Sequence, residues 1–392
     1  MCDMNYFTSD ANKIITIIFV KSPEDMDIKK ERCKPKMTHQ IFQKESIFGY
    51  NGLKVKLFYS CYTYHCYVEI SYLDKWDDTY WGLKADNIID CLSPWLREAM
   101  ILNKADFINI LKNYERSLKY GVSLEEFDHL VLPDRNILGS IRICDIKDKE
   151  FVKLHQRFES LIIMYIDAAN FIDMTDNNWK VIYLYEKKFV KPNVIRYTPI
   201  GFATIYIFDT KKIGRISQFF ITPLYQGQGL GFIFLRTISQ YLRSNALDIK
   251  KISVESPNKL FTYLRDKVDV SNCLDLPVFT INEIRGGLAS DAYKRICSNF
   301  KLCKKQAKRI YEILRAYYCD LGIDDYEEFK SNFIKDRKIE ILDLRIYPKR
   351  ERDYQLKLFE SNIAIQNANL NKVFENFMRS IQHILLYLKT RI

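Results

Sequence analysis

A short glycine-rich junction between an apolar segment and an amphipathic segment restricts the possible folds of this chain more than any other feature. Residues 218–242 read QFFITPLYQGQGLGFIFLRTISQYL, with Gly227, Gly229 and Gly231 at alternate positions. The residues before the glycines form an apolar run typical of a strand. Those after them have the spacing of a helix that packs on a sheet. The sequence therefore predicts a strand–loop–helix unit with a glycine-rich loop.

The spacing of the glycines excludes two common nucleotide-binding loops. A dinucleotide-binding fingerprint needs G-x-G-x-x-G, but the sixth position counted from Gly227 is Phe232. A P-loop needs a lysine followed by serine or threonine, and the segment has neither pair. The motif that fits is Q-x-x-G-x-G, formed by Gln226, Gly229 and Gly231.

Such a loop favours a phosphorylated ligand. Glycines let the backbone approach a ligand closely and adopt positive φ, and the N-terminus of the following helix favours an anion. We therefore predict that the loop binds a pyrophosphate. A tight turn with incidental glycines is the alternative interpretation.

Composition and charge narrow the class of protein. The chain has 392 residues, of which 47% are hydrophobic and 28% charged, as in ordinary globular proteins of two or three domains. Its formal net charge of +11 favours acidic partners, such as a phosphorylated cofactor or nucleic acid. The dense basic runs at 301–309 and 347–352 are interpreted as solvated helix faces, with a nucleic-acid contact as the open alternative.

Cysteine usage and hydropathy predict an intracellular chain without a membrane span. The ten cysteines form no C-x-x-C pair, and no secretory signal pattern is visible. This pattern is typical of reduced thiols rather than of disulfides or a zinc site. The apolar run 14–20 has seven residues, whereas a membrane span needs about 20. We expect a buried strand there.

Hydrophobic spacing divides the chain into three parts, 1–165, 166–270 and 271–392. The first alternates aromatic-rich strands with helices, the second is mostly strands around the glycine loop, and the third is helical. The expected strands are 14–20, strands within 53–73, 139–145, 179–190, 200–210, 215–222 and 249–255, with 179–190 and 200–210 as hairpin partners. The expected helices are 105–118, 148–168, 230–243, 257–267, 304–322 and 355–389, the fifth ending at Gly322 and the last packing on its own domain.

The loop and several other blocks resemble the type B histone acetyltransferase catalytic subunits, within the GCN5-related N-acetyltransferases. The blocks are RISQFFITPLYQGQGLG (215–231), ISVESPNKLFTYLRDKVDV (252–270), LDLPVF (274–279), SIFGYNGLKVKLFYS (46–60), FIDMTDNNW (171–179) and KQAKRIYEILR (305–315). They lie in all three parts of the chain. The resemblance implies an α+β protein: a central mixed-sheet acetyltransferase fold with an N-terminal α/β domain and a C-terminal helical domain.

The resemblance also implies acetyl-CoA as the acetyl donor, without a metal. In the family the strand before the loop, here Phe219, Phe220 and Ile221, offers backbone groups to the pantetheine arm. Without the resemblance, these three residues would be interpreted as a core strand. The two interpretations are compatible, because the contacts with the pantetheine arm come from the main chain. The cradle for the pyrophosphate would comprise Gln226, Gly227, Gln228, Gly229, Leu230, Gly231 and Phe232, with Asn258 as a further cofactor contact. Leu230 replaces a residue that is more often polar in the family.

Acetyl transfer to an amine requires a base, and Glu255 is the predicted one. A lysine amine has a pKa near 10.4, so it must lose a proton before it attacks a thioester. A carboxylate at the end of a buried strand has a raised pKa and suits this role. The family's proposed base is the glutamate at this position, but Ser256 follows it where the family commonly has aspartate. Covalent catalysis by a cysteine nucleophile, Cys273, is the rival hypothesis. In the second alternative, Glu255 is a solvent-exposed residue at a strand end without a catalytic role.

A histone tail is basic, as this chain is, so a local groove must bind it. The resemblance places tail contacts at Glu45 and Ser46 and at Tyr206, Ile207 and Phe208. Trp179 and Tyr206 resemble aromatic residues near the acceptor lysine, where apolar walls and cation–π contact would hold its stem. Ordinary strand-core aromatics are the alternative. The surroundings of His65, CYTYHC, favour an alternating strand over a metal site.

The predicted function is transfer of acetyl from acetyl-CoA to lysine ε-amines in the tail of a newly made core histone, of the histone-four type. The family works with a WD-repeat histone-binding subunit in cytoplasm and nucleus, so we expect that partner, no membrane partner, and leave nucleic acid open. Two alternatives remain: acetylation of another amine, or a non-catalytic histone escort or nucleic-acid binder that keeps only the fold.

Overall fold

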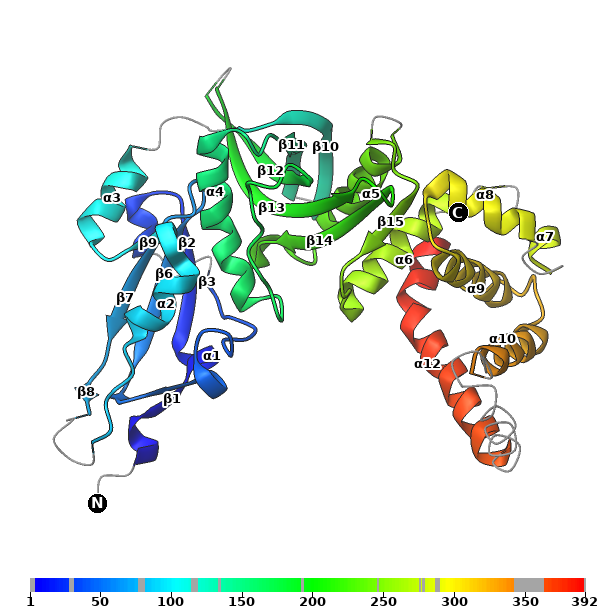
Figure 1. The fold of residues 1–392 in the computed structure, drawn as a ribbon, viewed down its shortest axis with the longest axis horizontal. Helices are drawn as coiled ribbons and strands as arrows, with labels where there is room; N and C mark the ends of the chain where they lie inside the picture. Colours follow the sequence, from blue (N-terminus) through cyan, green and yellow to red (C-terminus); the bar gives the residue numbers. More distant parts are fainter. Residues whose placement is uncertain are drawn as a thin grey trace. The chain divides into compact units, whose positions relative to one another are not determined.

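The computed structural model describes residues 4–27, 32–76, 82–113, 119–132, 135–191, 194–244, 247–274, 276, 279–285, 290–341 and 363–390 (Figure 1). The chain forms two compact units. The first comprises Met1–Asp209 and Ile216–Thr237, and the second comprises Thr210–Arg215 and Ile238–Ile392. These units do not test the three-part division at residues 165 and 270, which stays a prediction.

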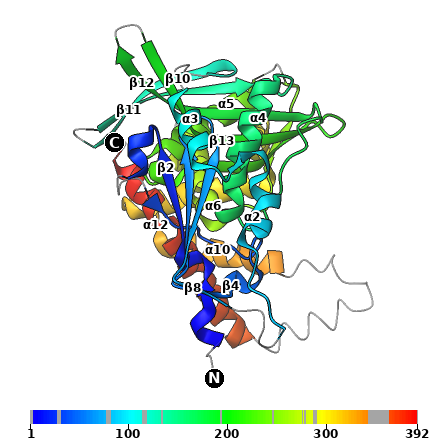
Figure 2. The same ribbon diagram turned by 90° about the vertical axis from the view of Figure 1, so that its left-hand side faces the viewer.

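The N-terminal part of the first unit contains a mixed five-stranded sheet, seen in Figure 2 from the side of β2. Its strand order is β3-β2-β6-β7-β9, in which β2 runs parallel to β6 and antiparallel to β3, β6 antiparallel to β7, and β7 parallel to β9. The strands are β2 (Ile15–Val20), β3 (Arg32–Cys33), β6 (Lys54–Ser60), β7 (Cys66–Ser71) and β9 (Met100–Ile101). Two short pairs accompany them, β1 (Thr8–Asp10) with β4 (Ser46–Phe48) and β5 (Tyr50–Asn51) with β8 (Asp74–Lys75).

Both faces of this sheet are covered, which explains why 14–20 is apolar without alternation. Successive side chains of a strand point to opposite faces. Ile17 and Phe19 enter the large core of the first unit, whereas Ile18 and Val20 pack with Phe107 of a helix on the other face. The helices near this sheet are α1 (Ala11–Ile14), α2 (Ile88–Leu96) and α3 (Lys104–Lys112). The prediction of a buried strand is confirmed.

A second sheet follows in the strand order β10-β11-β12-β13-β14-β15. Its members are β10 (Val122–Leu132), β11 (Arg135–Cys144), β12 (Trp179–Lys191), β13 (Val194–Phe208), β14 (Ile213–Ile221) and β15 (Lys251–Val254). β10 to β13 pair antiparallel in sequence order. The expected hairpin of 179–190 with 200–210 is confirmed, and Trp179 lies opposite Tyr206.

Helix α4 (Lys149–Glu159) packs the two sheets of the first unit into one core. Its apolar residues recur at helical spacing, and Asp148 caps the helix by accepting from two backbone amides. The Phe158 ring stacks on Tyr64 of the N-terminal part at 3.7 Å and meets Phe202 of the second sheet edge-on at 5.0 Å. The helix is shorter than the predicted 148–168, because Ser160–Met164 tightens into a buried 3-10 turn.

The second unit is mainly helical, and its core contains the last helix of the chain. The helices are α6 (Lys259–Cys273), α7 (Ile281–Arg285), α8 (Ser290–Phe300), α9 (Lys304–Asp320), α10 (Tyr326–Ile341) and α12 (Ile363–Lys389), while α5 (Leu230–Arg243) crosses the boundary between the units. Six apolar residues of α12, spaced by three and four positions along the sequence, are buried: Leu370, Phe374, Phe377, Ile381, Ile384 and Leu388. Packing of this helix on its own domain is therefore confirmed.

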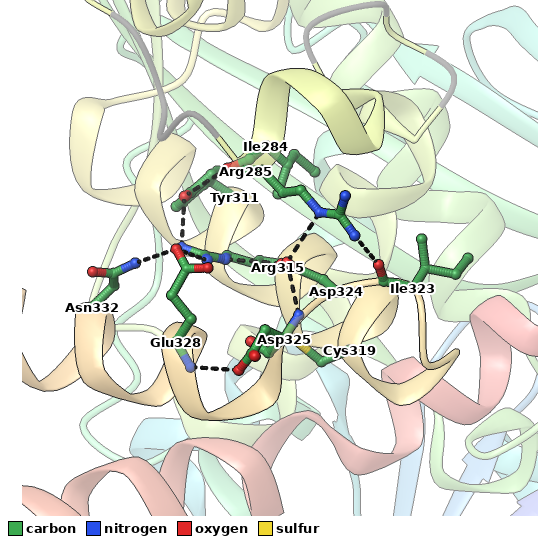
Figure 3. A network of polar contacts seen from close by, with 10 residues as sticks. All are labelled: Ile284, Arg285, Tyr311, Arg315, Cys319, Ile323, Asp324, Asp325, Glu328 and Asn332. Carbon is green, nitrogen blue, oxygen red and sulfur yellow. Dashed lines mark hydrogen bonds and ion pairs between the residues drawn. The ribbon is translucent and has the colours of Figure 1, made fainter.

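A buried ion-pair network ties α9 to the turn that follows it (Figure 3). Arg315 Nε donates to Asp324 Oδ2 at 3.0 Å, and the two side chains are 3% and 1% exposed. Arg315 also donates to Glu328 at 3.2 Å, and Arg285 lies 3.5 Å from the other Asp324 oxygen. Gly322 follows α9 with a φ of +69°, as expected of a glycine that ends a helix. These contacts hold the C-terminal end of α9, the turn after it and α10 together.

Three further features concern a helix end, the start of α6 and the hydropathy of the helices. The helix expected at 105–118 is observed as α3, ending at Lys112, and 114–118 lie outside the described residues, as do the basic run 347–352 and residues 355–362. Ser256 does not cap α6; Asn258 does, accepting from the Phe261 amide at 2.8 Å. Within the described part of the chain, no helix has the length and hydropathy needed to cross a bilayer.

Candidate functional site

The glycine loop lies between the end of β14 and the start of α5, as the sequence predicts (Figure 1). A short 3-10 turn, Pro223–Tyr225, leads from the strand into the loop. Gly227 and Gly229 have φ values of +74° and +81°, a region that side-chain-bearing residues rarely adopt. A Cβ added at Gly227 would meet no atom within 4 Å. The backbone at Gly227 is therefore open to a ligand, and its conformation requires glycine.

Three hydrogen bonds from side chains hold the loop backbone in place. Gln226 Nε2 donates to the Ile221 carbonyl at 2.7 Å, and Gln228 Nε2 donates to the Leu224 carbonyl at 2.7 Å. The third comes from His129 on β10, whose Nε2 lies 2.7 Å from the Gln228 carbonyl oxygen. Sequence reasoning missed His129, because nothing in its neighbourhood along the chain marks a residue that meets position 228 in space.

This loop fits a pyrophosphate better than a plain turn. Gly227 and Gly229 have positive φ, whereas Gln228 between them does not. Such alternation of left-handed and other backbone conformations turns successive N–H groups toward one side, which is how backbone anion sites are built. The helix that follows adds the positive end of its dipole and the amides of its first turn. Leu230, Gly231 and Phe232 form that turn, and the Phe232 amide bonds to the Gly229 carbonyl at 3.1 Å. Leu230 is buried, so the change from a polar residue affects packing and leaves the backbone available.

The strand before the loop combines core side chains with usable main chain. Phe220 is 3% exposed and packs on Phe158, and Ile221 is also buried. Phe219 points to the other face and meets Phe234 of α5, with ring centroids 5.1 Å apart. The core interpretation of these three residues is confirmed for Phe220 and Ile221, while their backbone contact with a pantetheine arm stays a prediction.

Glu255, the predicted base, belongs to the second unit and follows β15 directly. Its side chain is 44% exposed, and its Oε2 lies 3.7 Å from Arg215 Nε. The burial from which the sequence argument derived a general base is therefore not found at this position, and β15 itself is only partly buried. Ser256, at a φ of +37°, marks a sharp change of chain direction after the glutamate. Asn258 caps α6, so its side-chain oxygen already has a structural partner.

The rival nucleophile is in a poor position for chemistry. Cys273 is fully buried at the end of α6, and burial, followed by the charge of Asp269, raises the pKa of its thiol well above the usual range. A thiol must ionise to act as a nucleophile, so this environment disfavours covalent catalysis.

His65 precedes β7 rather than lying within a strand, and burial lowers its pKa to about 4. No group of metal-ligating side chains occurs among the described residues.

The aromatic residues predicted near the acceptor lysine lie together on neighbouring strands. The rings of Trp179 and Tyr206 meet edge-on at 4.9 Å, and Tyr206 meets Phe208 at 4.8 Å. Ile207 points to the opposite face and is buried. Trp179, Tyr206 and Phe208 are only partly buried, unlike the core aromatics of the same sheet. A partly exposed aromatic cluster suits an alkylammonium stem.

Glu45 ends the short 3-10 turn Gln43–Glu45, and Ser46 begins strand β4, in the N-terminal part of the first unit. Glu45 Oε1 accepts the Thr38 amide at 2.9 Å, and this hydrogen bond, followed by one with Asn12, lowers the pKa of the Glu45 carboxyl. Its side chain remains 35% exposed, and His39 lies 3.8 Å away. Glu45 therefore has a local structural role in addition to any contact with a substrate.

This double role decides how the predicted tail contact is tested. Glu45→Gln keeps an oxygen for the Thr38 amide and removes the charge, whereas Glu45→Lys removes both. We expect Glu45→Gln to raise KM for a basic tail peptide about two- to five-fold at low salt, the value of one exposed ion pair. The difference from wild type should vanish at high salt, because the Debye length falls to about 3 Å at 1 M. An unchanged peptide KM at low salt would place the tail elsewhere.

A buried carboxylate that the sequence did not single out lies at the end of α4. Glu159 is 1% exposed, and its Oε1 accepts from the Ile172 amide at 2.9 Å and from Gln218 Nε2 at 2.8 Å. Gln218 also contacts Thr204 at 3.1 Å. Burial raises the pKa of Glu159 to about 7. The group therefore takes up a proton on folding between pH 4.5 and 7.

We expect Glu159→Gln to stabilise the protein above pH 7. The folded pKa is raised, so wild-type stability falls as pH rises from about 4.5 to about 7, by roughly 1.4 kcal/mol per unit. Glutamine keeps the acceptor oxygen and carries no charge, so the variant should exceed wild type by up to roughly 3 kcal/mol at pH 8 and match it near pH 4.5. Urea unfolding at both pH values measures this, and equal curves at pH 8 would mean that Glu159 is not desolvated.

Three family models match successive segments of this chain. The model described as histone acetyl transferase HAT1 N-terminus matches residues 7–167, the acetyltransferase (GNAT) family model matches 157–260, and the model for the histone acetyltransferase type B catalytic subunit, C-terminal, matches 265–316. The GNAT segment contains β12 to β15 together with the glycine loop. Fold and loop thus define an acetyltransferase of the GCN5-related class.

Curated relatives match this chain over most of its length. The histone acetyltransferase type B catalytic subunit of Homo sapiens is 27% identical over 393 residues, covering 97% of this chain and 93% of its own. Those of Candida albicans and Arabidopsis thaliana are 28% and 26% identical, covering 79% and 83% of this chain and 76% and 75% of their own. The chain is similar to the histone acetyltransferase type B catalytic subunits over most of its length.

Solved structures add little to this assignment. The crystal structure of Tetrahymena GCN5 is 12% identical and covers 24% of this chain and 51% of its own, with a TM-score of 0.19. A TM-score this low carries no argument. The fold class therefore rests on the matched family models and on the observed α+β architecture, which confirm the expected class.

Proposed function

We propose that this acetyltransferase transfers acetyl from acetyl-CoA to lysine ε-amines in the tail of a newly made core histone, of the histone-four type. The observation that carries the proposal is the glycine loop, with left-handed Gly227 and Gly229, a braced backbone and a helix N-terminus behind it. Similarity to the curated relatives supplies the substrate class, since they are named histone acetyltransferases.

Each part of the proposed reaction has candidate residues. Residues Gln226 to Phe232 would hold the pyrophosphate, and the main chain of Phe219 to Ile221 would hold the pantetheine arm. The thioester supplies an activated acetyl group to a neutral amine. Trp179 and Tyr206 would flank the stem of the acceptor lysine, as their partial exposure and mutual contact support. Glu255 would accept the proton from the lysine ammonium before the amine attacks.

A partner and a location complete the proposal. Histone binding in the family involves a WD-repeat subunit, and we propose such a partner for this chain, acting in cytoplasm and nucleus. The chain carries a net charge of +11, so a basic tail needs local acidic and aromatic contacts or a second subunit to bind. A requirement for a partner is consistent with that charge.

Purified protein with labelled acetyl-CoA and each core histone separately tests the substrate. We expect label on one histone tail, and mass spectrometry of the product would assign the lysines. Label on polyamines or protein N-termini instead would support acetylation of another amine. No transfer to any amine, with intact histone binding, would support the non-catalytic escort. Burial of Cys273 disfavours a covalent acetyl-enzyme, and a hydroxylamine-labile label on the protein itself would contradict this.

A further inference from the structure

The edge strand β10 places one side chain against the backbone of the glycine loop. His129 Nε2 lies 2.7 Å from the Gln228 carbonyl oxygen, although the two residues are 99 positions apart. A carbonyl oxygen only accepts hydrogen bonds, so Nε2 carries a proton and donates it. A Cβ built on Gly229 would lie 2.7 Å from the same nitrogen. His129 therefore contacts the loop at its central peptide.

A second attachment holds β10 against the helix that follows the loop. Glu125 and His129 are four residues apart on the strand, so their side chains point to the same face. Glu125 Oε1 accepts from Arg236 of α5 at 2.5 Å, and its other oxygen accepts from the Thr237 hydroxyl. Because the strand is anchored to α5 in this way, His129 has a fixed position beside the loop.

The hydrogen bond sets the orientation of one peptide plane. In a trans peptide the C=O and N–H bonds point in opposite directions. With the Gln228 carbonyl directed at His129, the Gly229 N–H is directed to the other side of the loop. Glycine tolerates both signs of φ, so this peptide would reverse at low cost if nothing held the carbonyl. A reversed peptide would present a carbonyl oxygen to an anion in place of an N–H donor.

We propose that His129 is a positioning residue that keeps the Gly229 N–H turned toward the pyrophosphate of acetyl-CoA. The inference rests on the proposed function, because it assumes that the loop binds this pyrophosphate. His129 acts through the loop backbone and not on the reacting atoms. A side chain at position 229 would displace the imidazole from this contact, in addition to the strain of a φ of +81°.

The test compares two acetyl donors in three variants. Acetyl-CoA contains the pyrophosphate, whereas acetyl-pantetheine lacks it. We expect His129→Leu to raise KM for acetyl-CoA about two- to ten-fold, the effect of one hydrogen bond, with kcat nearly unchanged. Its kcat/KM for acetyl-pantetheine should equal that of wild type. His129→Gln, whose amide Nε2 also donates, should restore most of the acetyl-CoA affinity. Leu130→Ser, an exposed neighbour on the same strand, is the matched control and should behave as wild type.

The outcomes distinguish a failure of the positioning role of His129 from a failure of the proposed binding of pyrophosphate by the loop. Equal losses on both donors in His129→Leu, or an unchanged acetyl-CoA KM, would overturn the positioning role of His129. A wild-type enzyme without preference for acetyl-CoA over acetyl-pantetheine would instead overturn pyrophosphate binding by the loop. Should His129→Leu unfold at low temperature, His129→Asn, whose shorter amide does not reach the carbonyl, gives the same comparison.

Discussion

Replacing Glu255 by glutamine is expected to lower kcat for a histone-tail peptide by about 10²–10⁴, the usual contribution of a general base. Glutamine keeps the size of the side chain and a carbonyl oxygen, but it does not accept the lysine proton near neutral pH. Acetyl-CoA affinity should remain nearly unchanged, because the glycine loop lies at a different place in the chain. Steady-state kinetics on one peptide, together with calorimetry of acetyl-CoA binding, measures both quantities.

The pH dependence of kcat in the same variant is an independent test of the role of Glu255. A lysine with a pKa near 10.4 supplies more neutral amine as pH rises, so Glu255→Gln should recover activity with pH while wild type levels off. Asp248→Asn is a matched control, because Asp248 forms the other carboxylate ion pair near β15, with Lys212 at 2.8 Å. Wild-type kcat at pH 7 in Glu255→Gln would mean that Glu255 only pairs with Arg215.

Replacing Gly229 by valine is expected to abolish acetyl-CoA binding while leaving most of the fold intact. A β-branched side chain at this position would occupy the place proposed for the phosphate. The structure gives another reason, because the Cβ would lie 2.7 Å from His129 Nε2 at a φ of +81°. Either His129 or the loop must then move, and in both cases the Gln228 carbonyl loses its hydrogen bond and the loop its amide geometry. Loss of two hydrogen bonds to a charged group costs about 3–6 kcal/mol, or more than about 100-fold in affinity.

Two other glycines, one in the same loop and one after α9, separate the effect of backbone strain from that of a steric clash. Gly227→Ala has the same left-handed strain, with a φ of +74°, but meets no atom within 4 Å, so its effect on acetyl-CoA affinity should be smaller. Gly322→Ala, at a φ of +69° after α9, should lower stability and leave acetyl-CoA affinity unchanged. Near-normal calorimetric affinity in a folded Gly229→Val variant would contradict the assignment of the loop.

Local sequence patterns were sufficient for the elements that surround the site. The helix expected at 230–243 is observed as Leu230–Arg243. The strands expected at 179–190 and 215–222 match within two residues, whereas β13 begins six residues before the expected 200–210. Glycine spacing and apolar periodicity are properties of neighbouring residues, so the loop and its flanking elements are readable from them. The buried face of α12 was predicted for the same reason.

The environment of each predicted residue depended on contacts between distant parts of the chain. His129 meets Gln228 across 99 positions, and Gln218 meets Glu159 across 59. Glu255 was expected to be desolvated from its place at a strand end, but its exposure depends on which segments cover that end, and 44% of it remains exposed. By itself the sequence determined the glycine loop, the elements on either side of it and the resemblance to type B histone acetyltransferases. Only the tertiary structure decided which side chains hold the loop and which carboxylate is buried, because burial and hydrogen-bond partners come from segments that no local pattern connects.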